Sequence, residues 1–108
     1  MLLLGSPGAG RIIPTVAQVI IHVLDHGMDL DKALATPRLY TRDGYPIDLE
    51  EGFAPETLAG LKTRGHGVRL KGKLNPFFGG VHVIALDPKG EGWKGSADPR
   101  RYGVVAKE

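Results

Sequence analysis

The chain has 108 residues, of which 42% are hydrophobic and 24% charged, with a formal net charge of +2. This is the composition of one small globular domain or of a piece of a larger one. Because the chain contains no cysteine, disulfides, thiolate catalysis and cysteine-type zinc sites are excluded. No apolar run is long enough to predict a membrane span, and the first residues lack the features of a signal peptide, so the sequence assigns no compartment.

The first predicted elements are a strand, a turn and a long helix. Leu2–Leu4 form an apolar run that predicts a short buried strand, and the glycine-rich segment 5–10 predicts a turn. Apolar residues recur at helical spacing from 11 to 26, in a stripe wide enough to predict a helix buried around much of its circumference. Pro14 suits the first turn of this helix, and Gly27 suits its end.

Shorter elements follow. Asp29 is a suitable cap for a second helix over Leu30–Ala35, and Pro55 opens a third helix that runs to about Arg64. Between these helices, residues 38–52 read as extended segments around a turn at Asp43-Gly44.

The last third of the chain predicts strands. Alternating residues indicate strands at Val68–Leu70 and 79–86, and Asp87-Pro88-Lys89-Gly90 predicts a hairpin turn to a return strand around Trp93. The basic stretch 64–73 lacks stacking aromatics, so it favours a solvated strand over a nucleic-acid surface. The whole pattern predicts an α+β fold over residues 1–108 with no internal boundary.

The glycine turn leaves three interpretations open. Gly5 and Gly10 match the glycines of a phosphate-binding P-loop, but Arg11 replaces the lysine and Ile12 replaces the metal-binding hydroxyl. A turn such as Gly8-Ala9-Gly10 can instead direct backbone N–H groups at a carbonyl oxygen that gains charge, which makes an oxyanion hole. The third interpretation is a tight strand-to-helix connection with no chemistry.

Two further groups of residues have side chains that are common in functional sites. His22 and His26 share a helix face, but no third ligand accompanies them, so no metal site is predicted. In the Asp98-Pro99-Arg100 segment, Asp98 is expected to cap a turn while Arg100 pairs with a carboxylate, and Arg38 is read in the same way.

Several stretches together resemble the γ-glutamyltranspeptidase family. These are GSPGAGRIIPTVAQVIIHVLDHGMDLDKALATPRLY, LAGLKTRGHGV and GSADPRRYG, which follow one another in the family's order and cover nearly the whole chain. The resemblance implies an N-terminal-nucleophile hydrolase architecture, an αββα sandwich, of which this chain is the C-terminal portion of the small subunit. It implies no cofactor.

The resemblance also implies which residues serve the chemistry. Gly8 and Ala9 occupy the positions of the paired glycines whose N–H groups form the oxyanion hole, although Ala9 adds a methyl group. Arg11, Asp98 and Arg100 fall in family signatures and are expected to be structural. The family's nucleophilic Thr lies upstream of the glycine turn in a Thr-Thr-His type motif, and no Thr of this chain stands in one.

The expected function is therefore part of a γ-glutamyl transferase or hydrolase acting on glutathione-like amides. The chain alone is expected to be inactive and to meet a γ-glutamyl substrate only when the upstream portion complements it. The alternative is a non-catalytic relative that acts as a binding or assembly module, with self-association as a homo-oligomer.

Overall fold

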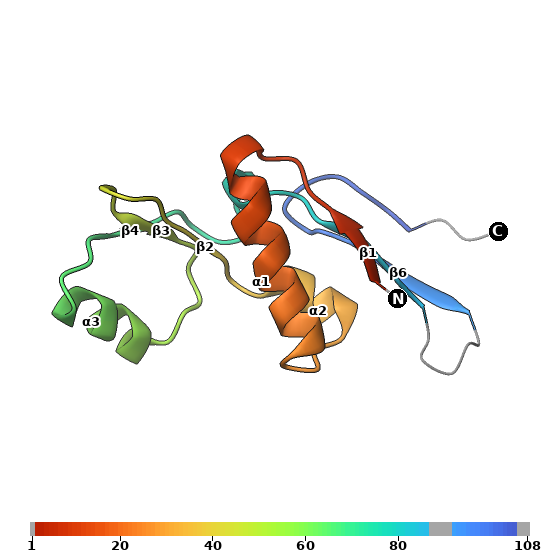
Figure 1. The fold of residues 1–108 in the computed structure, drawn as a ribbon, viewed down its shortest axis with the longest axis horizontal. Helices are drawn as coiled ribbons and strands as arrows, with labels where there is room; N and C mark the ends of the chain where they lie inside the picture. Colours follow the sequence, from red (N-terminus) through yellow and green to blue (C-terminus); the bar gives the residue numbers. More distant parts are fainter. Residues whose placement is uncertain (1, 87–91, 106–108) are drawn as a thin grey trace.

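Two small β-sheets are set along an elongated body, with the longest helix between them (Figure 1). The computed structural model describes residues 2–86 and 92–105 and measures 49 × 24 × 21 Å. Its helices are α1 (Ile12–Leu24), α2 (Leu30–Ala35) and α3 (Pro55–Thr63), and its short 3₁₀ turns are η1 (Ala9–Arg11) and η2 (Pro76–Phe78). Its strands are β1 (Leu2–Gly5), β2 (Leu39–Tyr40), β3 (Ile47–Leu49), β4 (Val68–Leu70), β5 (His82–Leu86) and β6 (Trp93–Ala97). This mixture confirms the predicted α+β class.

The first sheet, in the order β1-β5-β6, is antiparallel throughout. Helices α1 and α2 pack on one of its faces, where Val19, Leu34, Val81 and Val83 form the buried core. Strands β5 and β6 pair antiparallel, as expected for the predicted hairpin. The predicted turn at 87–90 lies outside the described residues. Burial of these aliphatic side chains is the main term that holds α1 against the sheet.

The second sheet, in the order β2-β3-β4, contains a parallel pair. Strands β2 and β3 are antiparallel around the predicted turn at 43–44, whereas β3 and β4 run parallel. The chain returns from β3 to β4 through α3, and such a crossover brings the second strand back in the same direction. The sequence pattern did not predict this parallel pair, because the length of the connection alone does not reveal the crossover.

The helix ends follow the predicted chemistry. Asp29 caps α2, since its side chain accepts a hydrogen bond of 2.9 Å from the backbone N–H of Lys32. Helix α1 ends at Leu24, two residues before its predicted end, and Gly27 has a positive φ of 65° after the turn that follows the helix. The predicted bounds of α2 are confirmed, and those of α3 differ by one residue at its end.

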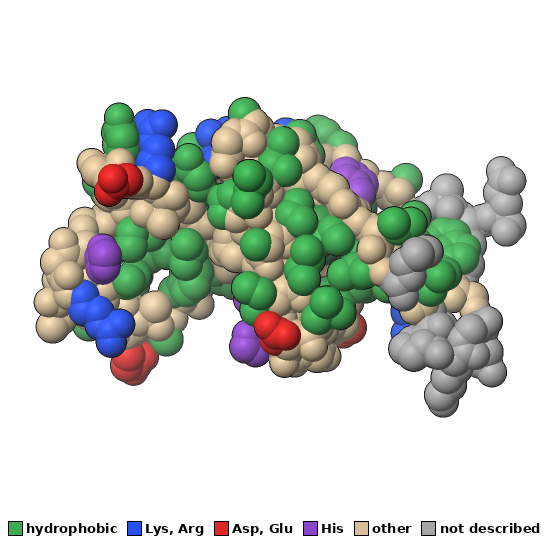
Figure 2. Space-filling view, viewed as in Figure 1, with side chains coloured by type: hydrophobic (Ala, Val, Ile, Leu, Met, Phe, Trp, Pro, Cys, Tyr) green, Lys and Arg blue, Asp and Glu red, His purple; other side chains and the backbone are tan. Residues whose placement is uncertain are grey.

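The prediction that α1 is buried around most of its circumference is wrong. Only Thr15 and Val19 are buried in α1, whereas Ile13 and Leu24 are 80% and 66% exposed. Figure 2 shows apolar side chains, in green, over the centre of the molecule, where Figure 1 places α1. The helix packs on a sheet with one side only, so the outer part of its apolar stripe stays exposed in the described part of the chain.

The predicted strand 79–86 begins three residues late. Gly79 has a φ of 96°, and a Cβ at its position would lie 2.5 Å from Ser6 Oγ. The η2 turn at 76–78 comes directly before this glycine and is capped by the Asn75 side chain, which accepts a hydrogen bond of 2.9 Å from the N–H of Phe77. The apolar pattern could not show this, because the close approach to Ser6 comes from a distant part of the chain.

Candidate functional site

The glycine turn presents a run of unpaired backbone donors. Gly8 and Ala9 both have positive φ angles, of 135° and 51°, and η1 begins directly after them. The N–H of Arg11 donates to the carbonyl of Gly8 at 3.0 Å, but the N–H groups of Gly8, Ala9 and Gly10 donate to no acceptor among the described residues. The start of a helical turn leaves such donors free, and they attract negative charge.

Hydrogen bonds join the glycine turn and the start of α1 to the segment 78–80. Ser6 Oγ donates to the carbonyl of Pro7 at 2.8 Å and accepts from the N–H of Gly80 at 3.1 Å. Thr15 Oγ1, from the first turns of α1, donates to the carbonyl of Phe78 at 3.0 Å. These bonds fix the direction in which the chain leaves β1 and enters α1, so the free donors are held on an ordered backbone.

Four charged side chains form a buried cluster, and each of these side chains is at most 1% exposed: Arg38, Glu50, Asp98 and Arg100. Arg38 Nη1 lies 2.6 Å from Asp98 Oδ2, and Arg100 Nη1 lies 3.1 Å from Asp98 Oδ1. Arg100 also binds Glu50 through two nitrogens: Nε donates to Oε2 at 2.8 Å, and Nη2 donates to Oε1. Two cations and two anions therefore balance one another away from water.

The same cluster ties together segments that are distant in sequence. Glu50 accepts from the backbone N–H groups of Arg38 and Asn75, each at 2.8 Å. Arg38 donates to the carbonyls of Leu34 and Phe78, at 3.1 and 3.0 Å. The end of α2, the end of β3 and the η2 segment are thus fastened to the loop after β6.

The expected pairing of Arg100 and turn-capping by Asp98 are both present. Asp98 Oδ1 accepts from the N–H of Arg100 at 3.0 Å, and Oδ2 accepts from the N–H of Val81 at 2.9 Å. Sequence analysis did not identify Glu50 as the second carboxylate, because nothing in the local pattern of β3 marks it for a partner 50 residues away.

Hydrogen bonds and charges set the ionisation of Asp98. Burial by itself would raise the pKa of Asp98, but the N–H groups of Val81 and Arg100 and the two guanidinium groups outweigh it and hold the pKa below the ordinary value. A depressed folded-state pKa means that this carboxylate contributes stability above the unfolded pKa of about 3.9 and loses it as the pH falls through the folded pKa.

Three threonine hydroxyls donate hydrogen bonds to backbone carbonyls in the described part of the chain. Besides Thr15, the hydroxyls of Thr36 and Thr63 donate to the carbonyls of Lys32 and Ala59, four residues earlier in the chain, at 2.8 and 2.9 Å.

The two histidines of α1 lie together without a third ligand. The ring centroids of His22 and His26 are 5.9 Å apart, and no group of three metal-ligating side chains occurs in residues 2–86 and 92–105. Burial, the nearby His26 and Arg38 all lower the pKa of His22.

We expect His22 to make the fold sensitive to mild acid. Because its folded-state pKa lies below the unfolded value of about 6.5, the unfolded chain binds the proton more tightly, and stability falls as the pH drops below about 6.5. Replacing it by His22→Gln should flatten this slope between about pH 6.5 and 5. Urea unfolding at a series of pH values measures the effect, with His66→Gln at an exposed site as control. An unchanged slope in His22→Gln would contradict the assignment.

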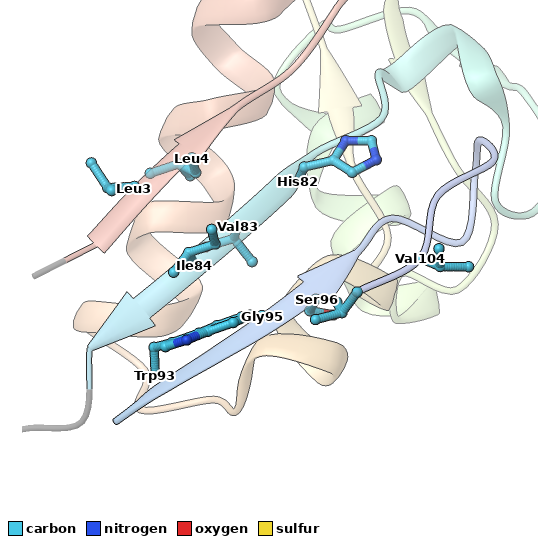
Figure 3. Close-up of a pocket in the computed structure, with 10 residues that line it drawn as sticks. Leu3, Leu4, His82, Val83, Ile84, Trp93, Gly95, Ser96 and Val104 are labelled. Carbon is cyan, nitrogen blue, oxygen red and sulfur yellow. The ribbon is translucent and has the colours of Figure 1, made fainter. Parts of the chain in front are cut away.

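The face of the first sheet that points away from α1 and α2 is apolar, and no helix covers it within the described residues. A shallow pocket of about 550 Å³ lies across β1, β5 and β6 and is also lined by Val104 and Val105, from the segment that follows β6. Figure 3 shows the residues that line it. Leu3 and Ile84 are 56% and 44% exposed there, and Val104 is 88% exposed. Exposed apolar area of this extent is typical of a surface that packs against something else.

A sheet covered by helices on one face and bare and apolar on the other is half of a four-layer sandwich. This is the arrangement of the N-terminal-nucleophile hydrolases, to which the structural neighbours belong, and the chain forms part of their αββα sandwich. The gamma-glutamyltranspeptidase family profile matches residues 1–108. The chain belongs to the γ-glutamyltranspeptidase family.

Three similar proteins illustrate the relationship. The glutathione hydrolase proenzyme of Escherichia coli is 38% identical over 101 residues, which are 92% of this chain and 16% of that protein. The T380A mutant of Helicobacter pylori gamma-glutamyltranspeptidase superposes with a TM-score of 0.81 at 35% identity, covering 93% of this chain and 54% of that one. A cephalosporin acylase from Bacillus halodurans gives a TM-score of 0.85 at 28% identity, over 95% of this chain and 19% of that one. The chain thus spans only about a sixth of the E. coli protein it matches.

The fold does not support the nucleotide-binding interpretation of the turn. A P-loop follows a strand of a parallel sheet, whereas β1 pairs antiparallel with β5. Within the described ranges, no helix is both long and apolar enough to cross a membrane.

Proposed function

We propose that this chain is the C-terminal part of an enzyme that transfers or hydrolyses the γ-glutamyl group of glutathione-like amides. In this proposal the N–H groups of Gly8 and Ala9 form the oxyanion hole, and Arg11, Asp98 and Arg100 hold the surrounding structure. The nucleophilic Thr is supplied by residues outside these 108, and the chain alone is inactive.

The observation that carries the proposal is the run of N–H groups at the glycine turn that donate to no acceptor among the described residues. These are the positions at which the sequence resemblance implies the oxyanion hole. Two such donors stabilise the negative charge that develops on a carbonyl oxygen during acyl transfer. The positive φ angles of Gly8 and Ala9 turn successive N–H groups out of the helical direction, which favours their convergence on one atom. The names of similar proteins, among them a glutathione hydrolase, support the substrate class.

The test is hydrolysis of a γ-glutamyl anilide by the chain alone and after mixing with the upstream portion of a relative. Release only after mixing supports the proposal, and release by the chain alone contradicts it. Formation of a complex without release supports the alternative, a non-catalytic assembly module, for which the bare sheet face is the favouring observation.

A charge on the bare face should block this complementation. Ile84 lies in β5 on the exposed side, so Ile84→Asp leaves the core on the other side of the sheet intact but makes the surface unsuitable for an apolar partner. We expect complex formation to be lost in a pull-down or sizing experiment, whereas Thr57→Asp on exposed α3 should form the complex normally. Equal binding by both variants would show that the complex does not use this face.

A further inference from the structure

A second polar cavity lies beside the glycine turn, between it and the second sheet. It has a volume of about 170 Å³ and is lined by Arg11, Tyr40, Arg42, Tyr45, Pro46, Asp48, Arg69 and Phe77. The site is next to the turn because the Tyr40 hydroxyl would lie 3.9 Å from a Cβ placed on Gly10. Of the residues given a role above, Arg11 lines this cavity, and no ligand has been assigned to it.

The charges around the cavity do not balance. Three guanidinium groups face one carboxylate, Asp48, and that carboxylate is already engaged by Arg69 through bonds of 2.9 and 3.3 Å. Arg11 and Arg42 form no ion pair with any carboxylate among the described residues. The cavity therefore carries positive charge that the described part of the chain leaves uncompensated.

The two unpaired arginines are held in place by aromatic rings instead. The guanidinium carbon of Arg11 lies 4.2 Å from the centroid of Phe77, and that of Arg42 lies 3.9 Å from the centroid of Tyr45. Stacking on a ring fixes the plane of a guanidinium group and leaves the N–H groups on its edge available. Arg11 is half-buried, and its Nε has no hydrogen-bond partner. A positioned cation whose donors have no acceptor is suited to bind an oxyanion.

We propose that this cavity binds the carboxylate group of a small organic acid. Arginine recognises carboxylates through paired N–H donors, and two positioned guanidinium groups can share one carboxylate. The small volume fits a carboxylate and the few atoms that carry it. The same donors also suit inorganic phosphate, so phosphate is the competing oxyanion in the test.

The proposal does not depend on the oxyanion role of Gly8 and Ala9, and its test measures binding rather than activity. The ¹⁵N-labelled chain is titrated with N-acetylglycine, with N-acetylglycinamide and with inorganic phosphate, at constant ionic strength, while backbone amide shifts are followed by NMR. N-acetylglycine should give saturable shifts confined to the residues around the cavity, with a dissociation constant in the millimolar range, about what a few charge-assisted bonds provide. N-acetylglycinamide should give none.

A matched pair of variants completes the test. Arg42→Gln removes one exposed guanidinium group from the cavity and should weaken N-acetylglycine binding about tenfold, the effect of losing one charge-assisted hydrogen bond. Arg64→Gln makes the same change in charge at the end of α3 and should bind as the unchanged chain does. If both variants lost the same affinity for N-acetylglycine, the effect would come from the net charge of the chain, and the proposed site would be wrong. Tighter binding of phosphate, or equal shifts with the amide, would overturn the carboxylate as ligand.

Discussion

Replacing Arg100 by alanine should lower the free energy of unfolding by about 3–5 kcal/mol, the cost of breaking a buried ion pair by removing one partner. The guanidinium group binds Glu50 and Asp98 and also donates to the carbonyls of Leu34 and Thr36. Without it, two carboxylates remain buried with only Arg38 to compensate them. A domain of this size has a total stability of about 5–15 kcal/mol, so the variant loses between about a fifth of that stability and all of it.

Urea unfolding monitored by circular dichroism measures this loss. The control is Arg64→Ala, which removes the same side chain from an exposed position at the end of α3 and should change stability by no more than about 0.5 kcal/mol. A loss below about 1 kcal/mol in Arg100→Ala would show that the cluster adds no more than a surface ion pair does.

Removing the backbone N–H of Ala9 should lower kcat of the complemented enzyme by about 10²–10³-fold, as measured for the loss of one oxyanion-hole donor. A semisynthetic chain with lactic acid in place of Ala9 replaces the amide by an ester and keeps the side chain. Because the N–H of Ala9 donates to no acceptor among the described residues, the folded state of the free chain should change little. KM should stay nearly constant, since the donor acts on charge that exists mainly in the transition state.

The matched control places glycolic acid at Gly44, in the exposed turn between β2 and β3, whose N–H likewise donates to no acceptor among the described residues. Rates of γ-glutamyl anilide hydrolysis for both esters are compared with that of the all-amide chain. If the Ala9 ester retains more than about a third of the rate, Ala9 does not supply an oxyanion-hole donor, and the turn is a tight connection only.

Local chemistry in the sequence predicted the elements whose ends depend on neighbours along the chain. Asp29 and Pro55 open α2 and α3 where expected, and Gly27 follows α1 with the positive φ that favours glycine. Features that arise from contacts between distant segments were not predicted. The 3₁₀ turn at 76–78 depends on Gly79 approaching Ser6, and the parallel pairing of β3 with β4 depends on where α3 lies.

The candidate site shows the same division. The resemblance singled out Gly8, Ala9, Arg11, Asp98 and Arg100, and the structure shows what each contacts. The resemblance did not identify Glu50 as the partner of Arg100. It also did not predict the arginine-lined cavity, because the side chains of that cavity come from η1, η2, the second sheet and the loops around it. The predicted burial of α1 failed because hydrophobic periodicity records which side chains are apolar, not which of them find a neighbour within these residues.

The bare face of the first sheet also has a calorimetric consequence. Whatever covers Leu3, Ile84 and Val104 removes apolar surface from water, and this makes the heat capacity of association negative. The enthalpy of that association must therefore become more favourable with rising temperature, while its hydrophobic driving force weakens in the cold. Assembly of this chain with its covering partner should accordingly be less complete on ice than at room temperature.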